Sequence, residues 1–322
     1  MTALLRRQAL PLALLLALAL VPVLGVQDGF SLGLLARAMI LGIAATSLSL
    51  LVGGAGLASL GHAAALGIGA YAVATLDLLG ITEGAVVFPA AILAAALYAL
   101  LTGLVSLRTG GVHFIMITLA FGQMVYFATS SLSALGGDDG YTLYGRTEFL
   151  GARLLEGRLP FHYLCLGLAA ATWLFCSMLL ESRFGRVLRA AKEEPMRVRA
   201  LGLSPYPYRL VAMTIAGALA GLAGALMANA MEFVSPAILS WPRSADLLFM
   251  VILGGVGHLH GALLGALALV LAEEVLSHLW DHWRLLFGPL LILAVIFLRG
   301  GLAGLPALLA QKLVQTLDRR AR

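Results

Sequence analysis

Residues 182–209 read SRFGRVLRAAKEEPMRVRALGLSPYPYR and interrupt a chain that is otherwise apolar enough to sit in lipid. The stretch contains seven Lys and Arg residues and two acidic residues. A charged side chain at the centre of a bilayer costs about 2.5–3.5 kcal/mol on insertion scales, so this stretch is excluded from the hydrocarbon core. The sequence therefore predicts an apolar helical bundle organised around one long charged loop.

The same stretch carries its own signals for a short helix. Pro195 suits the first turn of a helix, because its missing N–H is not needed there, and Glu193 and Glu194 lie beside the positive end of the helix dipole. Gly202 suits the left-handed position that closes a helix, and the prolines after it prevent that helix from resuming. We predict a helix over about 195–201, held between two turns in a cytoplasmic loop.

The composition places the rest of the chain in a membrane. Of the 322 residues, 61% are hydrophobic and 11% are charged, whereas soluble domains are about 25% charged. Since a membrane span needs about 20 apolar residues, the pattern predicts one all-α polytopic domain, residues 1–322, with about ten transmembrane helices. Residues 1–26 resemble a signal peptide, but we predict that they are not cleaved and form the first transmembrane helix. The predicted spans are 9–26, 32–52, 63–80, 85–107, 112–134, 160–180, 209–231, 244–258, 261–280 and 285–299.

The distribution of Lys and Arg predicts the orientation of these spans. With both termini in the cytoplasm, 15 of the 21 Lys and Arg residues fall on the cytoplasmic side and 5 on the outer side, and Arg37 lies within a span. This bias follows the positive-inside rule, which explains the positive net charge without a nucleic-acid partner. The longest predicted outer loop is 136–159, and the predicted cytoplasmic C-terminal tail is 300–322.

Two glycine-rich stretches break the spanning pattern. Residues 53–69 read GGAGLASLGHAAALGIG and residues 254–265 read GGVGHLHGALLG, so two GG-x-G motifs begin 201 positions apart. Broken helices at corresponding places in two halves indicate a repeat built around a central transport pathway. Alternatively, glycine simply lets helices pack closely, as small residues do in membranes. We favour two related halves and a pathway, to which the second motif contributes Gly254, Gly255 and Gly257.

The segment 232–243, EFVSPAILSWPR, joins two predicted spans. It is too apolar for a free loop, and its two prolines make it too broken for a span. We predict a short interfacial or re-entrant helix at the outer face, with Trp241 at the level of the lipid headgroups.

Other patterns exclude several classes of site. The chain has two lysines, Lys192 and Lys312, and neither follows the G-x-x-x-x-G spacing of a P-loop. No catalytic triad or metal-ligand spacing is visible, so the sequence predicts no catalytic site, no metal and no cofactor. Charges inside spans are costly and therefore functional candidates. These are Arg37 and the adjacent Glu273 and Glu274, for which we favour structural pairing of Arg37 with one glutamate over a proton relay.

Several motifs together resemble one family of transporters. The resemblance is carried, in order over about residues 30–306, by LSLLVGGAGLASLGHAAALGIGAY (48–71), TGGVHFIMITLAFGQMV (109–125), GGDDG (136–140), SRFGRVLRAAKEEPMRVRALGLSPYPYRL (182–210), AGALAGLAGAL (216–226), FMVILGGVGHLHGALLGA (249–266) and IFLRGGLAGL (296–305). The chain resembles LivM-type permeases, the membrane subunits of branched-chain amino acid ABC importers.

The resemblance implies partners and two sets of site residues. Family members work in the bacterial inner membrane with a second, different permease chain, two ATP-hydrolysing subunits and a periplasmic solute-binding protein. They move a small solute by alternating access and have no ATPase site of their own. The charged loop would dock on an ATP-hydrolysing subunit through Arg189, Lys192, Glu193, Glu194, Arg197, Arg199, Leu201 and Gly202. The translocation pathway would be lined by Gly53, Gly54, Gly56, Ser59, Gly61 and His62.

Three alternatives to an amino acid importer remain open at this stage. Urea and short-chain amide permeases share the same architecture and differ in substrate. A stand-alone secondary transporter or channel would depend on ion gradients rather than on ATPase partners. An intramembrane enzyme would need a nucleophile or a metal site that the sequence does not contain. Neither of the last two classes requires a cytoplasmic docking helix like the one predicted over 195–201. This helix therefore favours the permease.

Overall fold

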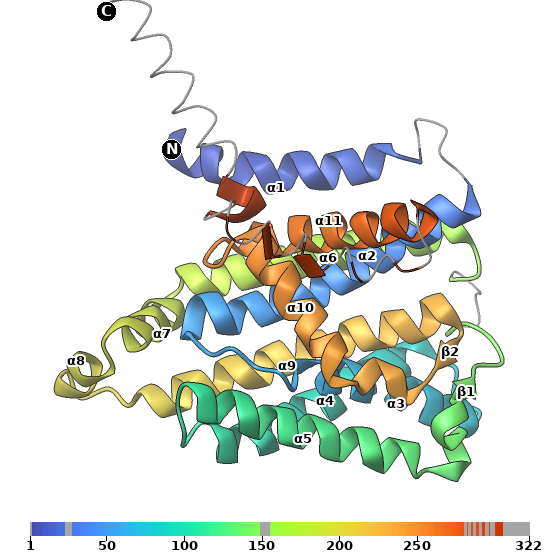
Figure 1. Ribbon diagram of the computed structural model, residues 1–322, viewed down its shortest axis with the longest axis horizontal. Coiled ribbons are helices and arrows are strands. Elements are labelled where there is room, and N and C mark those ends of the chain that lie inside the picture. The colour runs from blue at the N-terminus through green and yellow to red at the C-terminus, as the bar shows by residue number, and fades with distance from the viewer. Residues whose placement is uncertain are drawn as a thin grey trace, which may run out of the picture.

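The computed structural model describes residues 2–22, 28–148, 155–279 and 300–304, with scattered positions between 282 and 296. Long helices lie side by side along one common direction, and two short strands lie at one end (Figure 1). The helices are α1 (Thr2–Leu20), α2 (Gly29–Ser49), α3 (His62–Leu78), α4 (Gly84–Ser106), α5 (Val112–Ser130), α6 (Arg158–Glu181), α7 (Arg183–Glu193), α8 (Pro195–Ala200), α9 (Pro205–Met231), α10 (Trp241–Gly254) and α11 (Leu259–Leu279).

Several shorter elements connect these helices. A π-helical segment, η1 (Leu50–Ala55), continues α2 directly. The remaining short elements are the 3-10 helices η2 (Ser133–Leu135), η3 (Gly137–Asp139) and η4 (Pro236–Leu239), and the strands β1 (Tyr141–Thr142) and β2 (Phe233–Val234).

The predicted all-α polytopic architecture is confirmed in its main feature. In the described part of the chain, six helices are long and apolar enough to cross a membrane: α2 with η1, α4, α5, α6, α9 and α11. A helix also lies in the other predicted spans up to residue 280, although α3 has 17 residues and α10 has 14. The predicted tenth span, 285–299, and most of the predicted tail, 300–322, lie outside the described residues, so the count of ten stays a prediction.

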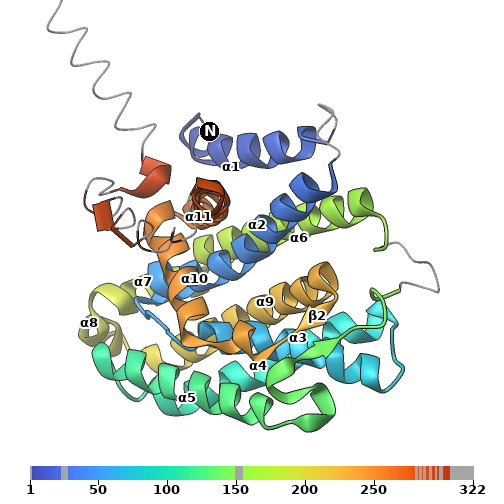
Figure 2. The ribbon, with the colours of Figure 1, turned by 45° about the vertical axis from the view of Figure 1, so that its right-hand side comes forward.

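The centre of the bundle is α2. Every residue of 38–50 is buried, and 83% of the most apolar 18-residue window of α2 and η1 is buried, against 22% for α5. A helix that is apolar on all sides faces either lipid or other helices, and the burial of α2 shows that other helices surround it. Helices α6, α9, α10 and α11 pack around α2, as the second view also shows (Figure 2).

Helix α9 crosses α3 and α4 at very close range because its contact positions are glycines. A Cβ atom on Gly224 would overlap the carbonyl oxygen of Leu66 in α3, and one on Gly221 would overlap the side chain of Ala95 in α4. Small residues at membrane helix crossings let backbones approach and gain dispersion contacts. The motif AGALAGLAGAL therefore fixes the spacing of three helices.

One end of the bundle carries a short ribbon that the sequence analysis did not anticipate. Strand β1 pairs antiparallel with β2, with Tyr141 opposite Val234 and Thr142 opposite Phe233. The Asn229 Oδ1 atom accepts hydrogen bonds from the backbone N–H of Thr147 at 2.8 Å and from its hydroxyl at 2.7 Å. These contacts join the end of α9 to the loop that follows α5.

The short helix predicted within 232–243 is present only as the four-residue η4, and its interfacial or re-entrant placement stays a prediction. Glu232 takes a left-handed conformation (φ 52°) that ends α9 and turns the chain away from the helix axis. The chain then forms β2, because its backbone groups find partners in β1, and only η4 is a short helix. Trp241 begins α10 and is 52% exposed.

We expect Gly224→Ala to lower the stability of the protein in detergent by about 1–3 kcal/mol, because the added methyl group overpacks the crossing of α3 and α9. Thermal unfolding followed by circular dichroism would measure the loss. The matched control is Gly167→Ala in α6, where a Cβ atom meets nothing within 4 Å. Equal unfolding temperatures for the two variants would contradict this account of the crossing.

Candidate functional site

The predicted helix in the charged loop is confirmed, and a second helix precedes it. Helix α8 covers Pro195–Ala200, and Gly202 closes it with φ of +79°. Where a turn was predicted before α8, the eleven-residue helix α7 is present instead. The hydroxyl of Ser182 caps α7 by accepting a hydrogen bond from the Gly185 N–H at 3.4 Å. Both helices project from the end of the bundle opposite the β-ribbon (Figure 1).

Helix α7 is seated on the bundle through one face. Leu188 is fully buried in a small apolar cluster with Leu51 of η1 and Met213 of α9. The Arg209 guanidinium in α9 donates a hydrogen bond to the carbonyl of Ala191 at 2.8 Å. Helix α7 is therefore fixed to both η1 and α9.

The eight predicted docking residues are all exposed, but they fall into two groups. Arg189 and Lys192 donate hydrogen bonds to carbonyl groups of this chain, to Leu180 at 3.0 Å and to Gly53 at 2.9 Å. The remaining six lie around α8, where Leu201 is 79% exposed. They are Glu193, Glu194, Arg197, Arg199, Leu201 and Gly202.

The first glycine motif ends a helix inside the protein. The π-helical η1 contains the first two glycines of the motif, and Gly56 ends it in a left-handed conformation (φ +71°). The chain then runs without helix to His62, where α3 begins. Hydroxyl groups of two other helices hold the break. Thr118 Oγ1 of α5 accepts a hydrogen bond from Leu60 N at 3.3 Å, and Ser244 Oγ of α10 accepts one from Ala63 N at 3.0 Å.

His62 is the polar centre of this region. The side chain is 5% exposed, and its Nε2 atom lies 2.8 Å from the Ser47 hydroxyl of α2. Ser59 Oγ accepts a hydrogen bond from the Gly61 N–H at 3.2 Å, which shapes the turn directly before His62. The hydrogen bond between Ser47 and His62 is the third link, so α2, α5 and α10 all contact the start of α3.

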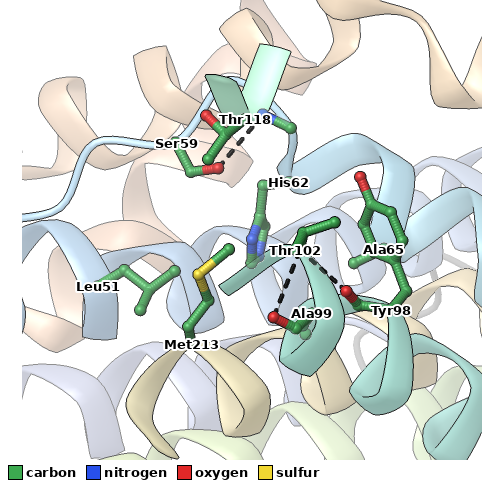
Figure 3. Close-up of a pocket in the computed structure, with 11 residues that line it drawn as sticks. Leu51, Ser59, His62, Ala65, Tyr98, Ala99, Thr102, Thr118 and Met213 are labelled. Carbon is green, nitrogen blue, oxygen red and sulfur yellow. Dashed lines mark hydrogen bonds between the residues drawn. The ribbon is translucent and has the colours of Figure 1, made fainter. Parts of the chain in front are cut away.

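A small cavity lies beside His62. It is lined by three of the predicted pathway residues, Ser59, Gly61 and His62, and by residues of η1, α3, α4, α5 and α9 (Figure 3). The space open to the centre of a water molecule is about 20 Å³, which is enough for one or two waters and too small for an amino acid. The cavity is therefore closed to a solute in this conformation.

The other predicted pathway glycines lie outside the cavity, toward α7. Gly54 faces the side chains of Leu180 and Leu188. A Cβ atom on Gly56 would lie 2.9 Å from Cγ of Lys192. The carbonyl group of Gly53, the first glycine of the motif, accepts a hydrogen bond from Nζ of the same lysine.

The two glycine motifs, which are far apart in the sequence, meet in space. A Cβ atom on Gly53 would lie 3.4 Å from Cα of Gly257. Gly255 and Gly257 have positive φ values, +113° and +96°, and Gly254 packs against Gly261 at the start of α11. The second motif thus forms the turn between α10 and α11 and lies against the first.

Comparison with known proteins decides the family. Residues 30–296 match the family described as branched-chain amino acid transport system / permease component. The chain belongs to this family. Family membership and the six apolar helices make it a multi-pass membrane protein and a transport subunit.

Individual relatives support the same assignment. The permease is 33% identical over 287 residues to the high-affinity branched-chain amino acid transport system permease protein LivM of Escherichia coli (strain K12), covering 82% of this chain and 68% of that one. It is 32% identical over 319 residues to LivM of Salmonella typhimurium, covering 92% and 75%. A shorter similarity, 31% identity over 106 residues and 31% of each chain, links it to a probable LivH permease of Methanocaldococcus jannaschii. No solved structure matches the permease.

The predicted pairing of Arg37 with a glutamate is present in the permease. Arg37 Nη2 donates to Glu273 Oε2 at 3.2 Å, and both side chains are about three-quarters buried, with 28% and 27% exposed. Glu274, one position on, points elsewhere and lies 3.0 Å from Nε2 of His278. The pair joins α2 to α11.

We expect Arg37→Leu to lower stability by about 1–3 kcal/mol, because Glu273 is left without its partner at membrane depth. The double variant Arg37→Leu/Glu273→Leu should recover most of that loss. Thermal unfolding in detergent measures both. Unchanged stability, combined with a loss of pH-dependent uptake, would favour the proton relay over the structural pair.

Proposed function

We propose that this permease is the membrane subunit of an ATP-binding cassette importer that moves branched-chain or related amino acids across the bacterial inner membrane. The names of its relatives favour this substrate class over urea or short-chain amides. The observation that carries the ATP-driven part of the proposal is the α7–α8 segment. It projects beyond the bundle, and its tip presents four charged side chains around the exposed Leu201.

The proposal includes the partners that such a subunit needs. An ATP-hydrolysing subunit would grip α8 in a groove, with the docking residues Glu193, Glu194, Arg197, Arg199, Leu201 and Gly202 at the contact. A charged rim around an apolar side chain is typical of protein interfaces. Two copies of the ATP-hydrolysing subunit, a second permease chain and a periplasmic solute-binding protein would complete the transporter.

The topology proposed for the chain follows from the same assignment. The end that carries α7 and α8 faces the cytoplasm, as the positive-inside rule favours for their many cations. The end that carries the β-ribbon then faces the periplasm. With ten spans in two related halves, the last of them at 285–299, both termini lie in the cytoplasm, together with loop 182–209 and tail 300–322, and loop 136–159 lies outside.

The translocation pathway is proposed to pass the break between η1 and α3. Hydroxyl groups, the His62 imidazole and a non-helical backbone are suited to a polar solute, and broken helices in membranes line such paths. The path would be lined by Ser59, Gly61 and His62 at the cavity and by the GG-x-G glycines toward the cytoplasm. The cavity is too small for an amino acid in the conformation described here, and we propose that closure of the ATP-hydrolysing subunits enlarges it by moving α7 and α8.

We expect Gly202→Pro to leave the protein in the membrane but to abolish ATP-driven uptake. Proline is fixed near φ −65° and cannot adopt the +79° that closes α8. Glu193→Arg should have the same effect by reversing a charge at the docking face. A pull-down of the tagged permease in mild detergent, with its partner subunits co-expressed, measures retention of the ATPase.

The matched control is Gly110→Ala, on another exposed turn at the same end, where a Cβ atom meets nothing within 4 Å. It should retain both the ATPase and uptake. Unaltered uptake by Gly202→Pro would remove the docking assignment. Gradient-driven uptake by the permease alone in liposomes would instead support a secondary transporter.

We expect a cysteine at position 102 to be labelled by small thiol reagents mainly during turnover. Thr102 lines the cavity, and the cavity holds only one or two waters at rest. Labelling of Thr102→Cys should therefore rise about tenfold or more with ATP and substrate, as expected for a closed state with about 1.4 kcal/mol or more in its favour. The buried Cys165 and Cys176 are replaced by alanine beforehand.

Thr172→Cys in α6 is the control, since Thr172 is equally buried but lies away from the cavity. It should stay unlabelled under both conditions. Equal labelling of the two cysteines during turnover would show general loosening of the bundle and contradict a pathway at His62.

A further inference from the structure

The side chain of Lys192 reaches back to the bundle, although the residue is exposed. Its Nζ atom donates a hydrogen bond to the carbonyl of Gly53, 139 positions earlier in the chain, at 2.9 Å. The carbonyl belongs to η1, whose helical bonding stops at Gly56, because the chain then turns away toward α3. The last carbonyl groups of a helix have no partner within that helix. The lysine supplies a donor to this carbonyl from α7.

The first glycine motif is shaped around α7 and its lysine. The stem of Lys192 passes over Gly56, where a Cβ atom would approach Cγ to 2.9 Å. A Cβ atom on Gly54 would lie 3.0 Å from Leu180 and 3.4 Å from Leu188, the residues on either side of the α6–α7 junction. A side chain at either glycine would therefore displace α7 or the lysine.

The contact continues from η1 to the rest of the break. Leu51, two residues before Gly53 in η1, packs in one cluster with Leu188 of α7 and also lines the cavity beside His62. On its other side Gly53 lies against Gly257 of the second motif. When α7 moves, Lys192 would therefore pull on η1 at the place where the two glycine motifs and the cavity wall meet.

We infer that Lys192 is a positioning residue that transmits movement of α7 to the two glycine breaks, rather than a residue that binds the ATPase. The inference rests on the proposed function, since it assigns the path by which ATP-driven movement of the docking segment reaches the translocation pathway. A single bond from a flexible lysine to a carbonyl can lengthen or re-form as the helix moves, and it does not lock η1 to α7 permanently.

The test uses the complete transporter, with its partner subunits, reconstituted in proteoliposomes. Amino acid uptake and ATP hydrolysis are measured on the same sample, and the ratio of the two is the readout. Lys192→Met keeps the length of the side chain and removes the donor. The complex should assemble, and uptake per ATP hydrolysed should fall about tenfold, as expected for the loss of one charge-assisted hydrogen bond.

Two further variants separate coupling from packing. Lys192→Arg keeps a long cationic donor and should retain more than half of the uptake per ATP, whereas Lys192→Gln, with a shorter reach, should retain less. Arg183→Met is the matched control, because Arg183 is also an exposed cation of α7. The control should keep the wild-type ratio.

The outcomes are distinct. A wild-type ratio in Lys192→Met overturns the inference, and so does equal behaviour of the Arg and Gln variants. Loss of the ATPase from the Lys192→Met complex would place the lysine at the docking face and also overturn it. Failure of the unaltered permease to co-purify with any ATPase would overturn the proposed function itself.

Discussion

The break between η1 and α3 depends on one constraint: a helix that is interrupted frees backbone groups that need new partners. Side chains of three other helices satisfy three of these groups. The donor for Gly53 O comes from α7, and the acceptors for Leu60 N and Ala63 N come from Thr118 of α5 and Ser244 of α10. Because the bonds run outward to so many helices, the break cannot change shape without moving its surroundings, and the surroundings cannot move without changing it.

Glycine performs two separate tasks in this permease, and backbone conformation tells them apart. In α9, Gly221 and Gly224 are helical, and the absence of a side chain sets how closely neighbouring helices approach. At the breaks, Gly56, Gly255 and Gly257 have positive φ values that L-residues rarely adopt, so glycine there sets the direction of the chain. The close-packing explanation considered for the two GG-x-G stretches does not account for these three glycines, although Gly254 and Gly261 of the second stretch do pack closely.

Much of this arrangement could be predicted from the sequence, and the failures have physical reasons. Proline and glycine at the two ends of α8 are local signals, and a charge inside a span demands a partner, so α8 and the Arg37–Glu273 pair were accessible. Helix α7 was missed because its buried positions, Gly185, Leu188 and Ala191, form a narrow stripe among many cations. The inward bond of Lys192 could not be predicted, since its partner is a backbone carbonyl that every residue type offers. The β-ribbon was missed because its two strands are only two residues long, which is too short for a pattern in the sequence.

The ribbon end of the molecule is tied together by contacts between segments that are far apart in the sequence. Pairing of β1 with β2, the Asn229–Thr147 bonds and the Arg146–Glu232 ion pair at 2.9 Å fasten the tops of α5 and α9 to each other. The loop after α5 and the end of α9 are therefore held together at the ribbon end. Under the proposed function, a solute arriving at this end would meet this fastened face, so its entrance would lie between this chain and the proposed second permease chain. The specificity of that entrance would then belong to the two chains together.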